Sequence, residues 1–553
     1  MEQGRLLLAI GLSFLVLFAW STFFVEQPPV SEPIEPTTTQ EATVDRPAGG
    51  DMVKPVEKES PVVEAALPQP GGTFAPSSRE VSVVTPFYTV LLDSQGASFT
   101  SYILNDYRES VDSDAPQKQL IAEKVKRGML RAGMAQRSVP GLENAVFLVE
   151  RVENEIVVRD QRESVAFKWV SEEGTSIEKI YTFDPQTYLI DLTVIVTNNS
   201  AQFLKDNLVL SLRSPVVEDR GYGFVGPSAL IDEKLEQVKI KKIEDKNEYS
   251  GKIKWIGIED RYFLSSIIPG EEINGRIHLE VLDDMVMNQL INPTFELATG
   301  EHKEYQFHIF MGPKSMELLD SLGHDLGKAL NFGFFNFIAK PCLWFMNQIH
   351  GVIPNYGIAI ILLTICTKIL LWPLGNKSYK SMSEMKKLQP LMTEIREKYK
   401  GDKQKMNQEL MALYRTYKVN PMGGCLPMVL QIPVFFALYR MLYQAIELRH
   451  APFFLWINDL SAPDRLFDFG FSIPFMEPPY GIPVLTIVMG ATMLLQQKMS
   501  PPPGDPTQAK MMMLMPIVFT FIFINFSAGL VLYWLVNNVL SISQQYYVQK
   551  KTA

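Results

Sequence analysis

Apolar and polar residues are distributed differently in three parts of the chain, and each pattern predicts a different kind of structure. Long apolar runs occur in the first 25 residues and again after Gly351. Residues 76 to about 320 alternate apolar with polar positions instead. Runs of about 20 apolar residues are typical of membrane-spanning helices, whereas alternation with period two is typical of half-buried strands. The chain is therefore predicted to combine a membrane part with a water-exposed β domain.

The middle stretch, residues 76–322, is predicted to be an all-β domain. The segment Val81–Tyr102 predicts two strands around a turn at 94–96, and residues 147–159 predict two more. Many short strands with few helices favour a β-sandwich. The clearest strand face has apolar residues at every second position: Tyr188, Ile190, Leu192, Val194 and Val196.

The N-terminal run, Leu6–Val25, follows Arg5 and is long enough to cross a membrane. A bulky Phe23-Phe24 pair disfavours signal-peptide cleavage nearby, so residues 1–25 are predicted to be a retained signal anchor. Residues 26–75 contain nine prolines and nine acidic residues. Such a composition cannot bury enough apolar area to order a chain, so this segment is predicted to be a disordered linker.

The C-terminal part is predicted to hold five further spans, which gives six in all and makes the chain a polytopic α-helical membrane protein. An aromatic-rich stretch, 323–350, predicts an amphipathic interfacial helix leading into the bilayer, or alternatively a packed core helix. The remaining boundaries are span 2 at 351–374, a helical hairpin at 375–422, span 3 at 423–446, a loop at 447–480, span 4 at 481–499, a loop at 500–510, span 5 at 511–527, span 6 at 528–548 and a tail at 549–553.

Charge predicts the orientation of these spans. The segment from Leu374 to Met422 carries eleven Lys and Arg against five acids, whereas Glu447 to Tyr480 carries two against five. By the positive-inside rule the first is cytoplasmic and the second is not. The same rule puts both chain ends in the cytoplasm, so that the β domain is exported; the family resemblance described below implies that it is periplasmic.

The basic segment has its own apolar pattern, which predicts a helical hairpin with a narrow apolar seam. It is either a solvated loop that sets topology or a docking arm for a partner or for anionic lipid. The seam residues are Met385, Leu388, Met392, Ile395 and Tyr399, then Met406, Leu410, Leu413 and Tyr417.

Composition narrows the function further. The net charge of −9 gives no global basic field for nucleic acid. The three cysteines make neither a disulfide framework nor a zinc site. The sequence has no P-loop, GxSxG or HExxH motif, and His302, Glu304 and His308 are interpreted as solvated strand residues. We therefore expect no enzyme activity, cofactor or metal.

One cation interrupts the apolar runs conspicuously, and two interpretations of it stay open. Lys368 lies about 9 Å from the cytoplasmic end of span 2, so its stem can snorkel to the interface. Alternatively it faces a wet cavity, since spans 2 to 6 contain no acid that could pair with it. Other polar residues in the spans fit a cavity or helix–helix contacts: Thr364, Gln431, Gln496, Asn537, Ser541 and Gln544.

Three longer motifs resemble one known family, the YidC/Oxa/Alb membrane protein insertases, in its Gram-negative layout. They are Lys418-Val-Asn-Pro-Met-Gly-Gly-Cys-Leu-Pro-Met through Tyr439, the stretch from Glu447 to Ser461, and Phe526-Ser-Ala-Gly-Leu-Val-Leu-Tyr-Trp534. The resemblance covers the chain from about residue 325, and the anchor, linker and β domain match the same layout. It implies that the β domain is a β-supersandwich similar in fold to sugar mutarotases, with no activity carried over.

The resemblance also implies a mechanism and a site. A hydrophilic groove, closed to the outside, carries a cation that attracts the acidic tail of an incoming substrate. Lys368 stands where relatives usually have arginine, which loses the planar bidentate fork. Thr364 and the Tyr533–Trp534 pair match positions associated with substrate contact, and Trp534 replaces a usual tyrosine. With Gln431, Asn537 and Ser541 these residues form the predicted substrate groove.

The implied function is insertion, folding and assembly of inner-membrane proteins, alone or with the Sec translocon. The implied partners are nascent membrane proteins, the translocon and its accessory subunits, the bilayer, and a ribosome or targeting receptor at the hairpin. Two other classes stay open: a solute transporter, which predicts an internal repeat, and a membrane-anchored periplasmic carbohydrate-active protein, which predicts an acid/base pair in the β domain.

Overall fold

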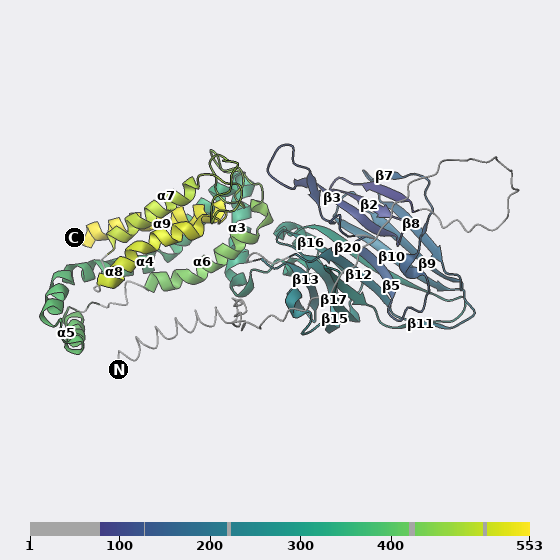
Figure 1. Ribbon diagram of the computed structural model, residues 1–553, viewed down its shortest axis with the longest axis horizontal. Helices are drawn as coiled ribbons and strands as arrows, with labels where there is room; N and C mark the ends of the chain where they lie inside the picture. The colour runs from purple at the N-terminus through teal and green to yellow at the C-terminus, as the bar shows by residue number, and fades with distance from the viewer. Residues whose placement is uncertain are drawn as a thin grey trace, which may run out of the picture. The chain divides into compact units, whose positions relative to one another are not determined.

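The protein is described from a computed structural model, shown in Figure 1. The structure describes residues 78–125, 128–217, 223–417, 419, 426–500 and 506–552. The chain divides into two units, Met1–Phe74 and Ala75–Ala553. The predicted anchor and linker lie outside the described residues. So do Lys418 and residues 420–425, which belong to the motif that begins at Lys418.

The first part of the second unit is a β domain built from two main sheets. A five-stranded sheet has the order β4-β3-β2-β1-β7, and a larger sheet has the path β5-β12-β18-β17-β15-β16-β20-β10-β9-β8-β6, with β13 and β14 attached beside β15. A separate pair joins β11 to β19. The strands are β1 Glu80–Val84, β2 Tyr88–Asp93, β3 Ser98–Arg108, β4 Gln117–Gln119, β5 Leu130–Met134, β6 Leu148–Val149, β7 Glu155–Val157, β8 Glu163–Val170, β9 Thr175–Phe183, β10 Leu189–Asn198, β11 Leu204–Asp206, β12 Leu208–Pro215, β13 Gly226–Ile231, β14 Lys234–Gln237, β15 Glu248–Glu259, β16 Phe263–Pro269, β17 Ile273–Leu282, β18 Met285–Ile291, β19 Phe295–Leu297 and β20 His302–Pro313.

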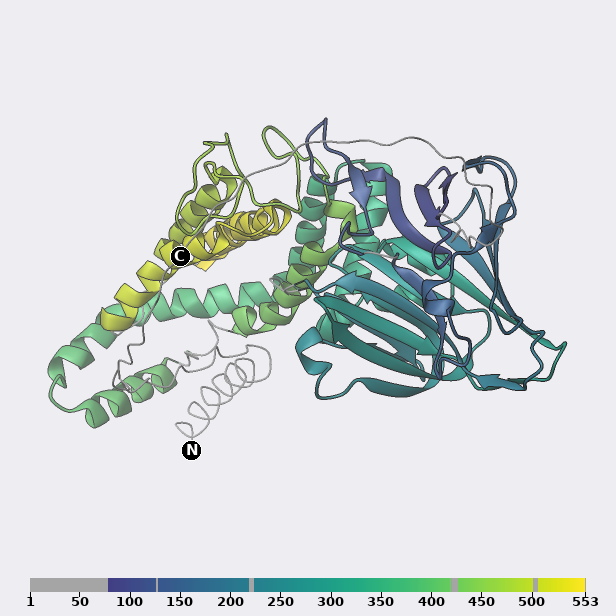
Figure 2. The same cartoon turned by 45° about the vertical axis from the view of Figure 1, so that its right-hand side comes forward.

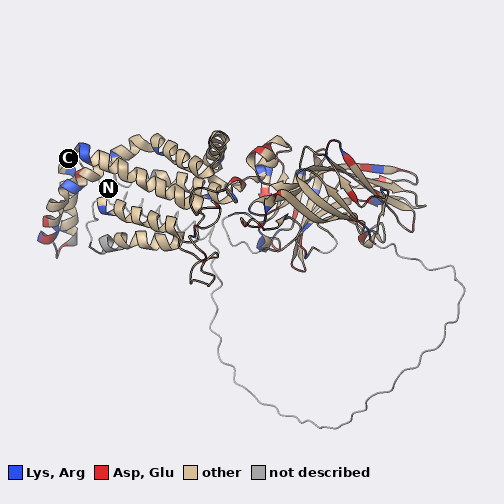
Figure 3. Ribbon diagram, turned by 90° about the horizontal axis from the view of Figure 1, so that it is seen from above, with Lys and Arg blue, Asp and Glu red and all other residues tan. Residues whose placement is uncertain are grey.

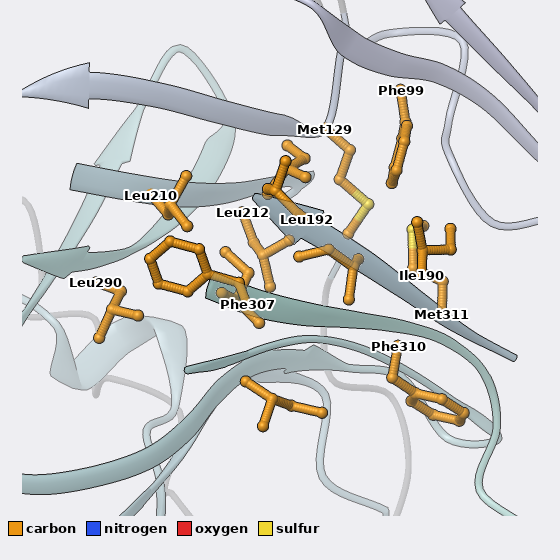
Figure 4. Packing of buried hydrophobic residues seen from close by; sticks show 14 of the residues in the cluster. Phe99, Met129, Ile190, Leu192, Leu210, Leu212, Leu290, Phe307, Phe310 and Met311 are labelled. Atoms are coloured by element: carbon orange, nitrogen blue, oxygen red, sulfur yellow. The ribbon is translucent and has the colours of Figure 1, made fainter. Parts of the chain in front are cut away.

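The core of this domain lies between the two main sheets. Phe99 of the small sheet shares a cluster with Ile190 and Leu192 of β10 and Phe307 of β20, all buried (Figure 4). Because side chains of a strand point alternately to opposite faces, one strand supplies such a layer with every second residue. The alternating face predicted over residues 188–196 is confirmed, since all five of its apolar residues are buried.

The prediction of two strands between Val81 and Tyr102 is wrong, because β1 and β2 already form a hairpin before the turn at 94–96. The extra turn is at Pro86, which has no N–H to donate to a ladder. The Thr85 hydroxyl accepts hydrogen bonds from the backbone N–H groups of Phe87 at 3.3 Å and Tyr88 at 3.0 Å. This local hydrogen bonding ends the first strand where the apolar pattern alone shows no break.

The rest of the second unit is helical. Short helical turns connect the longer elements: η1 Leu142–Asn144 and η2 Ile240–Lys242 within the β domain, then η3 Leu326–Ala329, η4 Gly333–Phe335 and η5 Ile446–Leu448. The helices are α2 Met316–Ser321, α3 Asn336–Val352, α4 Tyr356–Lys398, α5 Lys403–Thr416, α6 Leu426–Gln444, α7 Val484–Met499, α8 Pro506–Phe523 and α9 Ala528–Thr552. The aromatic stretch predicted as one helix over 323–350 therefore begins with the turns η3 and η4, and its helix starts only at Asn336.

Helix α4 is continuous from the apolar segment into the basic hairpin, as Figure 2 shows. Asn355 caps its start by accepting from the Ile358 N–H at 3.0 Å. Pro373 and Pro390 lie inside it without ending it. Among the described helices, α4 is the one long and apolar enough to cross a membrane, and Met512–Phe523 is a shorter apolar stretch. The number of spans therefore stays a prediction.

The predicted hairpin seam is largely confirmed. Leu388 and Met392 of α4 are buried with Leu410 of α5, and Met385, Ile395, Met406 and Leu413 pack against them. Tyr399 and Tyr417 lie outside this cluster, because each follows the last residue of its helix. Tyr414 takes part instead, donating from its hydroxyl to the Met392 sulfur at 3.7 Å.

Candidate functional site

A small polar cavity lies between α4, α6 and α9. Its volume is about 40 Å³, which is room for water molecules. Polar and apolar side chains alternate around it, so water inside would find hydrogen-bonding partners. The lining residues are Thr367, Lys368, Leu371, Leu374, Gly375, Tyr379, Gln431, Val434, Tyr533, Asn537 and Gln544.

Lys368 supplies the positive charge of the cavity. Its ammonium group donates to the Ser541 hydroxyl at 2.7 Å, and Ser541 in turn donates to the Asn537 carbonyl at 2.7 Å. No carboxylate forms an ion pair with Lys368 anywhere in the described part of the chain. A neutral hydroxyl leaves the charge uncompensated and leaves two further N–H donors for a visiting group. The side chain is half-buried, so a carboxylate that reached it would be only partly screened by water.

Close packing of α4 against α9 positions this lysine. A methyl group at Gly375 would lie 2.7 Å from the Gln544 amide nitrogen. Gln544 donates to the Trp372 carbonyl and to the Asn376 side chain, each at 3.0 Å. Because these bonds join the two helices one turn beyond Lys368, they fix the register that brings Ser541 to the ammonium group.

The structure brings together five of the seven predicted groove residues. Lys368, Gln431, Tyr533 and Asn537 line the cavity, and Ser541 holds the lysine. Thr364 is buried and donates to the Ile360 carbonyl of its own helix at 2.6 Å. Trp534 does not line the cavity either; its ring packs against Phe435 and Phe523, with centroids 4.6 and 4.8 Å away.

Thr367, Gly375 and Tyr379 line the cavity but were not predicted to do so. Thr367 immediately precedes the lysine and, like Thr364, is a polar residue in an apolar run, a signal that the sequence did contain. Gly375 and Tyr379 follow Leu371 at four-residue steps and so lie on the same side of α4. The pattern of polar residues in the sequence did not predict that they line a cavity. A second basic side chain, Arg440 of α6, donates to the carbonyl of Phe332, the residue before η4, at 3.4 Å.

The β domain presents weaker candidates for chemistry. His308 and Asp191 form a pair across β20 and β10 at 2.7 Å, and the neighbouring imidazole lowers the pKa of that carboxyl. No group of three or more His, Cys, Asp and Glu side chains placed to hold a metal ion occurs among the described residues. Lys179 is fully buried and donates to the Gly96 carbonyl at 2.6 Å, and burial lowers its pKa to about 7.

Fold and site together define a class: a helical membrane protein with a charged polar cavity, carrying a large β-sandwich domain. Two family models match the chain, "60Kd inner membrane protein" over residues 348–553 and "YidC periplasmic domain" over residues 80–345. The membrane protein insertase YidC of Syntrophobacter fumaroxidans is 41% identical, covering 99% of this chain and all of the relative. That of Syntrophus aciditrophicus is 39% identical, covering 99% of each. A solved structure of an active YidC insertase aligns with 18% identity and a TM-score of 0.38, covering 86% of this chain and 93% of that one.

The chain belongs to the YidC family of membrane protein insertases of the inner membrane. Its relatives are insertases and not enzymes, so no catalytic residue is assigned. The β domain corresponds to the family's periplasmic domain.

Proposed function

We propose that the Lys368 cavity is the groove through which this insertase receives the polar tail of an incoming membrane protein. The observation that carries the proposal is the ammonium group held on a neutral hydroxyl, with no carboxylate paired to it among the described residues. An acidic tail would supply the missing anion. The substrate residues proposed are Lys368, Thr364, Gln431, Tyr533, Trp534, Asn537 and Ser541, with Thr367 and Tyr379 added from the cavity lining.

The barrier that such a groove lowers is the transfer of polar residues across hydrocarbon. The apolar segment of a substrate enters lipid favourably by itself, at about 25 cal/mol for each Å² buried. Short helices also favour passage: α7 has 16 residues, which is about 24 Å at 1.5 Å per residue and less than a bilayer core of about 30 Å. A thinned bilayer and a wet cation together lower the barrier without any chemical reaction.

The proposed topology has six spans, with both chain ends and the α4–α5 hairpin in the cytoplasm. Charge supports it, because the last turns of α4, α7 and α9 carry Arg396, Lys498 and Lys550 respectively. Gln549 donates to the Met499 carbonyl at 3.2 Å, which brings the ends of α9 and α7 together. In Figure 3 the ribbon positions of Lys and Arg, coloured blue, are frequent at the end of the helical part that carries the C-terminus.

The proposed partners are nascent membrane proteins, the Sec translocon with its accessory subunits, and a ribosome or targeting receptor at the hairpin. The hairpin supports the last of these, since its apolar seam is internal and exposed lysines such as Lys377, Lys380 and Lys386 remain on its outer faces. Phosphate groups of RNA or lipid are the ligands that such a surface attracts. Co-sedimentation with ribosomes that carry a nascent chain, with and without these three lysines changed to Glu, tests this contact.

The test of the groove is substrate insertion in cells depleted of the protein and complemented with variants. Lys368→Ala is expected to leave small substrates with acidic tails accessible only from the cytoplasm, whereas Lys368→Arg keeps the charge and inserts them. A substrate with an uncharged tail serves as the control. If Lys368→Ala inserts every substrate as well as the unmodified protein does, the lysine is an interfacial anchor and the proposal is wrong.

A further inference from the structure

The segment joining α6 to α7 holds apolar side chains out of the protein. Phe475 is 93% exposed and Leu455 is 86% exposed, although large apolar side chains are normally covered. Six large apolar side chains within about 20 residues are exposed in this segment, so the exposure is concentrated here and is not an isolated exception. The six residues, termed the apolar rim, are Phe454, Leu455, Phe467, Phe469, Phe471 and Phe475.

The backbone beneath the apolar rim is firmly held. Arg465 donates to the Pro479 carbonyl at 2.9 Å and to the Ile524 carbonyl at 2.8 Å. Asn525, which follows α8, donates from its side chain to the Phe475 carbonyl at 3.0 Å. Asp459 accepts from the N–H groups of His450 and Ser461. The outward direction of these side chains is therefore built into the fold.

Backbone strain points the same way. Leu455, Phe467 and Phe475 have φ angles of 62°, 63° and 65°. Bulky residues rarely adopt this left-handed conformation, because the Cβ atom approaches the following carbonyl. In water, these three residues would cost free energy through their strained backbone and also through their exposed apolar surface. Transfer of the side chains into an apolar environment would offset this cost.

The neighbouring surface identifies that environment. Ile487 and Val488 in the first turns of α7, and Phe521 and Ile522 in the last turn of α8, are also exposed and apolar. The end of α8 adjoins the rim, because Arg465 donates to the Ile524 carbonyl and Asn525 donates to the Phe475 carbonyl. The start of α7 follows the rim in the sequence. Arg449 donates to the Glu109 carbonyl at 3.2 Å, so both arginines of the segment are engaged by the protein. The rim thus offers apolar surface continuous with the lipid-facing helices.

We infer that the apolar rim lies in the periplasmic leaflet, with its rings at the boundary between headgroups and acyl chains. This rests on the proposed six-span topology, which puts the segment on the periplasmic side. Phe and Leu side chains on the apolar face of an interfacial segment typically enter about 5–10 Å into the boundary between headgroups and acyl chains. The rim would hold the periplasmic ends of α6, α7 and α8 at one depth in the membrane. Because the helices are short, the bilayer around them would then become thinner, and the helices would not shift into one leaflet.

The experiment is depth-dependent quenching in liposomes containing the full-length protein. Native cysteines are replaced by serine, and an environment-sensitive fluorophore is attached at Phe475→Cys or Phe471→Cys. Lipids carry a nitroxide either near the headgroup or deep in the acyl chain. Val152→Cys, equally exposed on the β domain, is the control in water, and Phe521→Cys on α8 reports the membrane part itself.

The rim labels are expected to emit at shorter wavelength than the Val152 label, and to be quenched several-fold more strongly by the shallow nitroxide than by the deep one. If they match the Val152 label while Phe521 is quenched, the rim is exposed to water and the inference is overturned, although the Phe521 result still places α8 in the membrane. If the Phe521 label is not quenched either, the proposed topology has failed.

Discussion

Individual buried charges in this protein are compensated in different ways. Lys314 and Glu259 in the β domain are both fully buried and form an ion pair at 3.1 Å, and Gln237 donates to the same carboxylate. Among the described residues, the Lys179 ammonium group donates to backbone carbonyl groups and lies 5.1 Å from the centroid of the Phe147 ring. The Lys368 ammonium group donates to the Ser541 hydroxyl. The charge of Lys314 is neutralised by Glu259, whereas the charge of Lys368 can still bind an anion.

We predict that Lys314→Met destabilises the β domain strongly. It leaves the Glu259 carboxylate buried without its cation, which typically costs about 3–5 kcal/mol. Replacing both residues, Lys314→Met with Glu259→Met, removes the orphaned charge and should recover most of the loss. Urea unfolding of the full-length protein, followed by pulse proteolysis of the β domain, measures Lys314→Met, Glu259→Met and the double variant. Additive losses in the double variant would show that the two charges are not coupled.

Lys179 predicts a pH dependence of stability. Burial lowers the pKa of this lysine from 10.5 to about 7 in the folded protein, so between these values the unfolded chain binds more protons. Stability should therefore rise with pH from about 7 toward 10, with a slope of at most about 1.4 kcal/mol per pH unit. Below pH 7 the lysine is protonated in both states and contributes no slope.

Lys179→Met should flatten this pH profile, because Met has a similar volume and no titrating group. The midpoint of urea unfolding measured at several pH values checks it, with Lys205→Met, a half-exposed lysine of β11, as the matched control. The slope is the readout, since loss of the hydrogen bond to Gly96 lowers stability at every pH. An unchanged slope in Lys179→Met would contradict the lowered pKa.

At the scale of elements, the helices of the membrane part approach one another through small residues. A methyl group at Gly490 of α7 would lie 2.1 Å from the Thr520 hydroxyl of α8. That hydroxyl is bonded to the Pro516 carbonyl at 2.7 Å, so it cannot simply rotate away. In lipid, where helix association depends on van der Waals contact, this close approach stabilises the pair.

Gly490→Ala is therefore expected to destabilise the helical part by about 1–3 kcal/mol through overpacking. Thr520→Ala removes the clashing oxygen and should restore part of the loss. Gly351→Ala in α3, where nothing lies within 4 Å of the added methyl group, is the control and should be neutral or slightly stabilising. Unfolding of the purified protein in mixed micelles measures all three. Equal behaviour of Gly490→Ala and Gly351→Ala would refute the close contact.

The elements also show what a sequence can and cannot reveal. Strand β10 was predictable because the alternation of apolar and polar residues can be read within a few neighbouring positions. The hairpin seam was predictable for the same reason, since its apolar residues recur every three or four positions. The break at Pro86 was missed, since the turn is held by the hydroxyl of the preceding residue, Thr85, and the apolar pattern does not show this hydrogen bonding. Lys368 stood out as a charge in an apolar run. Its partner Ser541 lies 173 residues later, and no local pattern encodes the register between two helices.

Thr364 shows another limit of the sequence. The resemblance predicts it as a groove residue, and its hydroxyl donates to the Ile360 carbonyl of its own helix. Threonine in a helix often makes this bond, which leaves the hydroxyl oxygen as an acceptor only. Whether a polar residue serves the site or its own helix depends on packing that periodicity does not describe. The resemblance to a family supplied the site residues that the pattern could not distinguish.

At the scale of the whole molecule, charge and helix direction agree on one orientation. The helices α4, α7 and α9 all end in basic turns, which satisfies both the positive-inside rule and the attraction of cations to helix C-termini. At the opposite end, Phe453 and Leu460 of the α6–α7 segment pack close to Gly357 and Gly529, at the starts of α4 and α9. The charged and the apolar ends of the helical part are thus distinct.

This agreement predicts which side of the membrane each end faces. Cysteines introduced at Lys386 in the hairpin and at Val152 in the β domain, in a protein without its native cysteines, should react oppositely with a membrane-impermeant maleimide. Only the Val152 site should be labelled in cells with a permeabilised outer membrane, and only the Lys386 site in inverted vesicles. Both labels on one side would mean that α4 does not cross the membrane between Val152 and Lys386, and the six-span topology would be wrong.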